Sequence, residues 1–244
     1  MRRIAMCATT ALALACATST ALAQSTVDID SHATPVVRKF SPNTTPTTLT
    51  VNLKFHGPNG GSADTLQRAV LKFTYGAKLN GNLFPSCTAQ TIRDHQKCPK
   101  GSVIGTGSAL GILGGDTDNP TKEQIKVTLY NGPKGKSIVF RIQGDAPAVI
   151  DVPFDAPLKT FSGGSYNFQL TVDVPELLQV IVGLPVSLDY FNVKVGATRV
   201  VKGKKRGYIE TLICPPLALV PLQGDFTFLE ADPFHIDTYI HCGA

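Results

Sequence analysis

The sequence contains no tryptophan, and only 7% of its 244 residues are aromatic. So few rings argue against a surface made of stacking platforms, such as a carbohydrate cleft or a groove for single-stranded nucleic acid. Charged residues are also scarce, at 17% of the chain, whereas hydrophobic residues make up 43%. This balance, with 22 glycines and 17 prolines that form no repeat, excludes a coiled coil, a collagen-like chain and an acidic disordered tail.

The first 23 residues have the features of a secretory signal peptide. Arg2 and Arg3 precede an uncharged run over residues 4–17, and an Ala-x-Ala sequence ends at Ala23. The apolar run is shorter than the roughly 20 residues that a membrane-spanning helix needs. We therefore predict cleavage after Ala23, no transmembrane segment in the remaining chain, and a secreted protein that is extracellular or periplasmic. Cleavage before Cys16, as in a lipoprotein, is the weaker alternative.

Removal of the signal peptide leaves four cysteines: Cys87, Cys98, Cys214 and Cys242. An even number of cysteines in an exported chain indicates disulfides rather than a metal site. Four cysteines allow three pairings, and we predict the two local ones, Cys87–Cys98 and Cys214–Cys242. No pair has the C-x-x-C spacing of a zinc site, so we expect neither a metal nor another cofactor.

Beyond residue 48, apolar and polar residues alternate with a period of two. This alternation is typical of antiparallel strands that have one face on a core. Glycine- and asparagine-rich turns separate the runs, and short helical segments are expected only at residues 88–95 and 175–182. We predict an all-β fold, a single-domain antiparallel two-sheet β-sandwich with very little helix. The alternating runs lie at residues 49–55, 71–75, 125–129, 138–142, 166–174, 191–195, 226–228 and 234–242.

Residues 24–47 are polar, rich in threonine, serine and proline, and show little periodicity. Such a composition is typical of a linker, and we predict a flexible N-terminal arm. The expected organisation is therefore a signal peptide over residues 1–23, the arm over residues 24–47 and the β-sandwich domain over residues 48–244.

The densest cluster of charge contains Arg199, Lys202, Lys204, Lys205 and Arg206, around a predicted hairpin turn. Five cations so close together could bind an anionic cell-envelope polymer or lipid headgroups. The alternative is a solvated turn whose lysines prevent pairing with another sheet edge. Without the two arginines of the signal peptide the net charge falls from +5 to +3, which does not support nucleic acid as a partner.

Two groups of residues resemble metal ligands. His235, Asp237 and His241 share one face of a predicted strand, but the two histidines would lie about 20 Å apart, too far to hold one ion. Asp116 and Asp118 lie in an oxygen-rich loop that lacks the full ligand ladder of a calcium site, so a turn is favoured over a cation-binding adhesin.

No residue is assigned a catalytic role, because no G-x-S-x-G motif occurs and the histidines have no partner at a recognisable spacing. The glycines of residues 105–111 lack dinucleotide-loop spacing and fit a closely packed strand better. The first hypothesis is a secreted or envelope-associated protein of unknown activity with a binding or structural role. The alternative is a secreted hydrolase acting on polysaccharide through carboxylates distant in sequence, such as Asp173, Glu176, Asp189 and Glu210.

One segment combines two cysteines with a glycine-containing strand: FPSC at residues 84–87, then CPKGSVIGTGSA at residues 98–109. It resembles a group of uncharacterised exported bacterial proteins in which a cysteine, a short helical loop and a C-P-x-x-S-x-x-G-x-G element recur. Later elements at residues 129–132 and at Cys214 and Cys242 are similar in kind, and residues 216–222 depart from the group. The resemblance implies a secreted β-rich domain with the same two disulfides and no catalytic residue.

Overall fold

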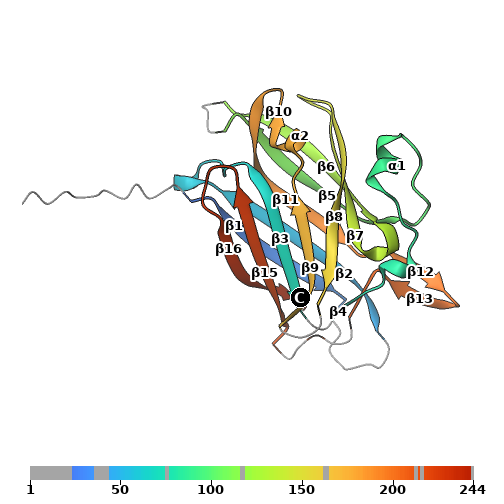
Figure 1. Ribbon diagram of the computed structural model, residues 1–244. Coiled ribbons are helices and arrows are strands. Elements are labelled where there is room, and N and C mark those ends of the chain that lie inside the picture. Colours follow the sequence, from blue (N-terminus) through green and yellow to red (C-terminus); the bar gives the residue numbers. More distant parts are fainter. Residues whose placement is uncertain are drawn as a thin grey trace, which may run out of the picture.

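A computed structural model of the chain shows strands wrapped around a common interior, with short helices outside them (Figure 1). The structure describes residues 24–35, 44–74, 77–115, 119–161, 165–211, 214 and 217–242. The predicted signal peptide and the loop residues Asp116 and Asp118 lie outside the described residues. Their assignments remain predictions.

Eleven strands form a closed barrel. Around the ring the order is β5, β6, β7, β8, β9, β3, β15, β16, β1, β2 and β11, and β11 pairs again with β5. All neighbours are antiparallel except β1 and β16, which run parallel. The strands are β1 (Thr26–Thr34), β2 (Thr45–His56), β3 (Leu66–Thr74), β5 (Val103–Leu113), β6 (Thr121–Asn131), β7 (Ser137–Gly144), β8 (Ile150–Thr160), β9 (Tyr166–Asp173), β11 (Leu184–Val195), β15 (Leu219–Phe228) and β16 (Phe234–His241).

The predicted two-sheet sandwich is therefore wrong, although the all-β class and the scarcity of helix are confirmed. The difference lies in how the sheet ends meet. β2 pairs with β1 along one edge and with β11 along the other, from Leu49 to Lys54, and this second pairing closes the ring. Alternating burial is the same in a sandwich and in a barrel, so the periodicity does not distinguish them.

The prediction of a flexible arm over residues 24–47 is also wrong where the structure describes it. β1 pairs with β2 from Thr26 to Thr34, and β2 itself begins at Thr45. Val27 and Ser31 of β1 are fully buried. The inward face of β1 thus includes a serine, and this polar residue hides the alternation that would have predicted a strand.

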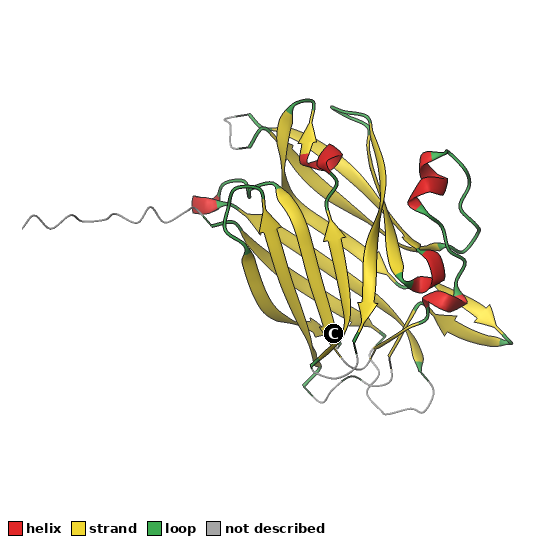
Figure 2. Ribbon diagram, viewed as in Figure 1, coloured by secondary structure: helices red, strands yellow, loops and turns green. Residues whose placement is uncertain are grey.

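Smaller elements are attached to the barrel, as Figure 2 shows. Helix α2 (Glu176–Gln179) and β10 (Val180–Ile181) precede β11, and helix α1 (Ala89–Arg93) packs outside β7 and β8. Both helices lie where the sequence predicts helical turns. None of the short helices in the described segments has the length and apolar character required to cross a bilayer. The remaining elements are β4 (Ala77–Leu79), β12 (Thr198–Val201), β13 (Lys204–Gly207), β14 (Ile209–Thr211) and three short 3-10 turns at Pro58–Gly60, Gly81–Leu83 and Pro133–Gly135.

Both predicted disulfides are present, and the Cα atoms are 5.4 Å apart in Cys87–Cys98 and 5.8 Å apart in Cys214–Cys242. The first closes the loop that carries α1, whose apolar face is buried with Tyr130 and Val139. The second joins the segment after β14 to the residue that follows β16. Two disulfides fit a chain that folds outside the reducing cytosol.

The glycines of β5 permit a close approach of β11. A Cβ atom on Gly107 would lie 2.0 Å from the carbonyl oxygen of Asn192, and one on Gly105 would lie 2.6 Å from that of Lys194. Both distances are far below van der Waals contact. The interpretation of this segment as a closely packed strand is therefore confirmed.

Candidate ligand-binding cavity inside the barrel

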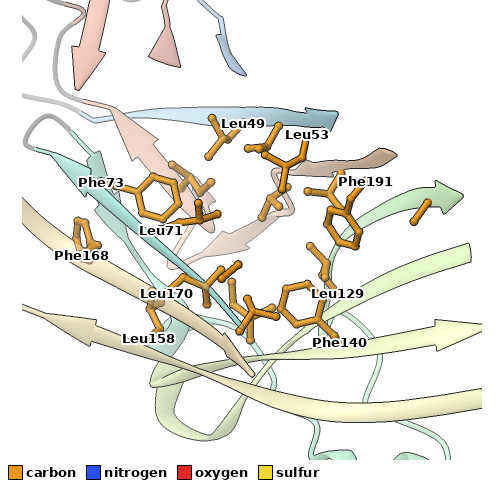
Figure 3. A pocket seen from close by; sticks show the side chains of 18 of the residues that line it. Leu49, Leu53, Leu71, Phe73, Leu129, Phe140, Leu158, Phe168, Leu170 and Phe191 are labelled. Carbon is orange, nitrogen blue, oxygen red and sulfur yellow. The ribbon is translucent and has the colours of Figure 1, made fainter. Parts of the chain in front are cut away.

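The barrel encloses an apolar cavity of about 250 Å³. Aromatic and aliphatic side chains from several strands converge on it, as Figure 3 shows. The period-two pattern explains this lining, because it turns every second residue of each strand inward. A barrel of about eight strands is just wide enough for its side chains to fill, and larger barrels enclose cavities. The labelled residues are Leu49, Leu53, Leu71, Phe73, Leu129, Phe140, Leu158, Phe168, Leu170 and Phe191.

The polar side chains of the lining are few and neutral. Thr47, Tyr208 and Thr211 are the hydroxyl-bearing residues, and no charged residue of the described chain lines the cavity. The hydroxyl of Thr47 lies 2.9 Å from that of Thr211 and 3.0 Å from the carbonyl oxygen of Thr45, so these groups satisfy one another. Such a lining can bind a ligand, but apart from the phenol of Tyr208 it offers no group for proton transfer.

Tyr208 connects β13 to β14, and its side chain is only 1% exposed. Its ring packs edge-to-face against Phe84, with the ring centroids 5.6 Å apart. Its amide N–H donates to the carbonyl of Ala197, and its own carbonyl accepts from the amide N–H of Asn80. The hydroxyl, in contrast, has no hydrogen-bond partner among the described residues. Burial raises the pKa of Tyr208, so this hydroxyl is a protonated donor at neutral pH.

The two ends of the cavity differ in chemistry. Strand β11 begins next to α2 and β10, where Leu178 and Ile181 line the cavity. It ends at Val195, which pairs with Leu49, two residues from Thr47 on the same strand. The lining residues next to α2 are therefore apolar, and the three hydroxyl-bearing residues, Thr47, Tyr208 and Thr211, lie toward the opposite end, where β14 pairs with β2.

The predicted cation cluster lies on the β12–β13 hairpin, which projects from the barrel in Figure 1. Its two arginines are bound to the protein. Arg199 donates to the carbonyl oxygen of Leu83, and its guanidinium lies 6.0 Å from the ring centroid of Phe84. Arg206 donates two hydrogen bonds of 2.8 Å to the carboxylate of Glu210. These side chains hold the hairpin in place rather than offering free charge.

The three lysines of the cluster, Lys202, Lys204 and Lys205, are exposed, and we call them the tip lysines. Their ammonium groups make no ion pair within the part of the chain that the structure describes. Lys202 and Gly203 form the turn with φ of 50° and 74°, which is the left-handed pair typical of a tight two-residue hairpin. The structure thus divides the predicted cluster into two structural arginines and three free lysines.

The carboxylates named for a hydrolase do not line the cavity. Asp173 pairs with Arg68 at 2.5 Å, and both side chains are more than half exposed. Glu210 is 1% exposed and is held by Arg206. Glu176 begins α2, and Asp189 lies at an irregularity of β11. Nothing in these positions favours the hydrolase hypothesis.

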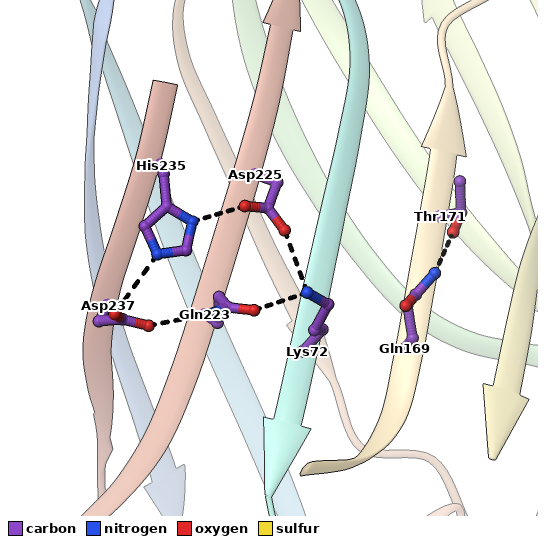
Figure 4. Close-up of polar contacts among 7 residues, drawn as sticks. All are labelled: Lys72, Gln169, Thr171, Gln223, Asp225, His235 and Asp237. Carbon is purple, nitrogen blue, oxygen red and sulfur yellow. Dashed lines mark hydrogen bonds and ion pairs between the residues drawn. The ribbon is translucent and has the colours of Figure 1, made fainter. Parts of the chain in front are cut away.

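A polar network covers the outer face of β16, β15 and β3 (Figure 4). His235 Nδ1 lies 2.5 Å from Asp225, and its Nε2 lies 3.4 Å from Asp237. Lys72 contacts Asp225 and donates to Gln223, which in turn donates to Asp237. The hydrogen bonds to Asp225 and then to Asp237 raise the pKa of His235. The network is a satisfied, partly exposed surface.

No group of residues in the described segments is arranged to hold a metal ion. His241, at the end of β16, lies beside His32, with the ring centroids 5.6 Å apart. It is not part of the network around His235. His235 and His241 thus contact different residues, in agreement with the separation that their spacing predicts.

The sequence did not identify the cavity or Tyr208. Many of the lining residues belong to the predicted apolar faces, but a sandwich would have brought those faces into direct contact. Tyr208 follows the cation cluster in a segment without periodicity, so no pattern marked it. Comparisons with protein-family models, with curated proteins and with solved structures find no match.

Proposed function

We propose that this protein is an exported binding protein that holds a small apolar ligand inside its barrel. The observation that supports this function is the cavity, which is lined almost entirely by hydrocarbon and lies within a closed ring of strands. Ligand pockets have this character, with apolar walls and a few placed polar groups. Binding rather than chemistry is favoured because the lining of the described chain carries no ionisable side chain except the buried tyrosine.

The cavity volume limits the size of the ligand. An apolar cavity of about 150 Å³ accepts one benzene ring. On the same scale, the cavity of about 250 Å³ accepts roughly ten non-hydrogen atoms. Transfer of roughly ten apolar atoms from water, at about 0.8 kcal/mol per methylene group, amounts to about 8 kcal/mol and corresponds to a dissociation constant of about 1 µM.

Naphthalene, a fluorescent hydrocarbon with ten carbon atoms, tests this function. We expect one molecule to bind per chain, measured as a change in its emission intensity that saturates at one equivalent. Ala69 lines the cavity and is buried, so Ala69→Phe fills the site and should abolish binding. Val200→Phe places the same ring on the exposed β12 strand and should bind naphthalene normally. No binding by the unaltered protein, or equal binding by the two variants, would refute the function.

We further propose that residues 1–23 direct export and are removed, and that the tip lysines hold the protein on anionic polymers or lipid headgroups of the cell envelope. Support for this role comes from the exposure of Lys202, Lys204 and Lys205 on a hairpin outside the barrel wall. Cations near an anionic surface contribute about 1 kcal/mol each. A protein held in this way keeps its cavity free for a ligand.

A further inference from the structure

We propose that the ligand is an uncharged molecule with one hydrogen-bond acceptor, and that the hydroxyl of Tyr208 donates to that acceptor. The inference rests on the apolar-ligand function proposed above and adds the chemical class of the ligand and its orientation. It starts from two observations about one residue: Tyr208 lines the cavity, and its hydroxyl is buried without a partner among the described residues.

An unpaired buried hydroxyl is unusual, because native proteins pair the great majority of their buried polar atoms. The other hydroxyls of the lining, on Thr47 and Thr211, already bond to each other. Tyr208 is therefore the donor that remains for a ligand. Its position gives the orientation: the acceptor of the ligand lies toward β14, and its apolar part extends toward Leu178 and Ile181 at the α2 end.

The charge around Tyr208 selects against an anion. No lysine, arginine or histidine of the described chain lines the cavity. Arg206 is the nearest cation in sequence, and the carboxylate of Glu210 already takes two of its hydrogen bonds, whereas Lys204 and Lys205 are exposed. A carboxylate ligand would be buried beside one neutral donor with no opposite charge, which is strongly unfavourable. Ketones, esters and alcohols need only the donor that is present, so the site favours them over fatty-acid anions.

Three compounds of ten non-hydrogen atoms test the inference at pH 8: nonan-2-one, naphthalene and octanoate. We expect the unaltered protein to bind nonan-2-one at least ten times more tightly than octanoate. In Tyr208→Phe, the affinity for nonan-2-one relative to naphthalene should fall about three- to tenfold, as for the loss of one neutral hydrogen bond. Tyr190→Phe is the matched control, because the hydroxyl of Tyr190 lies outside the cavity lining, 3.4 Å from Gln124, and it should leave the ratio unchanged.

The outcomes separate the two proposals. If naphthalene binds but Tyr208→Phe leaves the ratio unchanged, the tyrosine is not the donor, and apolar binding stands. If octanoate binds as tightly as the ketone, the preference for an uncharged ligand is refuted. If none of the compounds binds the unaltered protein, the proposed function itself fails.

If Tyr208→Phe does not fold, the infrared carbonyl band of nonan-2-one bound to the unaltered protein tests whether the ketone accepts a hydrogen bond. A hydrogen-bonded carbonyl absorbs at lower wavenumber than the ketone in hexane. A shift to lower wavenumber supports the inference, and a band at the hexane position overturns it.

Discussion

Glu210 is a buried carboxylate that the fold keeps ionised. Burial opposes its charge, but hydrogen bonds from Arg206, Thr44 and the amide N–H of Gly207 outweigh that effect and lower its pKa to about 2. Because Arg206 belongs to β13 and Thr44 precedes β2, the carboxylate ties the hairpin to the barrel. Its ionisation is therefore linked to stability.

This linkage predicts a pH dependence. A lowered pKa stabilises the folded protein above the ordinary value of 4.5, and the contribution is lost as the pH falls toward 2. The shift corresponds to about 3 kcal/mol. Glu210→Gln should thus be less stable than the unaltered protein at pH 6, and the gap should narrow steadily in urea unfolding at pH 5, 4 and 3. A gap that stays constant over this range would contradict the linkage.

Phe226 is a core residue whose contribution to the free energy of unfolding can be measured. It is 1% exposed, and its ring packs edge-to-face against Phe55 at 6.2 Å. Phe226→Ala should lower the free energy of unfolding by about 3–5 kcal/mol, through lost transfer energy and a residual cavity. Its exposed neighbour supplies the control, since Thr227→Ala should cost less than about 1 kcal/mol. Denaturant unfolding of both variants checks the prediction, and equal losses would contradict the assigned faces.

At the scale of the element, the β12–β13 hairpin carries the clearest exposed charge. Changing the tip lysines Lys202, Lys204 and Lys205 together to glutamine should abolish retention on anionic phosphatidylglycerol vesicles at low salt. Retention of the unaltered protein should fall steeply as salt rises, because exposed charges are screened over about 8 Å at physiological ionic strength. Sedimentation with the vesicles over a salt series measures both effects.

A second triple variant distinguishes the contribution of the hairpin to retention from that of the overall net charge. Lys122, Lys126 and Lys159 are also exposed and belong to β6 and β8. Their change to glutamine removes the same charge elsewhere and should leave most of the retention. If both triple variants lose retention equally, the hairpin is not a docking element and net charge alone accounts for binding.

The sequence predicted individual strands better than their assembly. Runs such as residues 49–55 and 138–142 alternate strictly, and they lie in β2 and β7. β8 was not predicted because it contains Pro153 and Pro157, and proline is unusual inside a strand. Pro153 is buried, and its carbonyl oxygen accepts a hydrogen bond from Arg93 of α1. Closure of the barrel depends on pairing between β2 and β11, which are distant in sequence. Local periodicity carries no information on such a pairing.

At the scale of the whole molecule, processing and oxidation define the covalent form of the protein. We expect intact-mass analysis of the exported protein to show the loss of residues 1–23 and of four hydrogen atoms, two for each disulfide. Alkylation without reduction should label none of Cys87, Cys98, Cys214 and Cys242. Retention of the first 23 residues would contradict the signal peptide, and a labelled cysteine would contradict the pairing.

The parallel pairing of β1 with β16 determines when folding can finish. Ser31 pairs with Ile240, and its hydroxyl donates to the carbonyl of Tyr239, 208 residues further along the chain. A contact between such distant segments raises the contact order and comes late, since a long loop must close first. A nascent chain still held at its C-terminal end lacks this last strand. Until β16 is available, the ring of strands therefore stays open between β15 and β1.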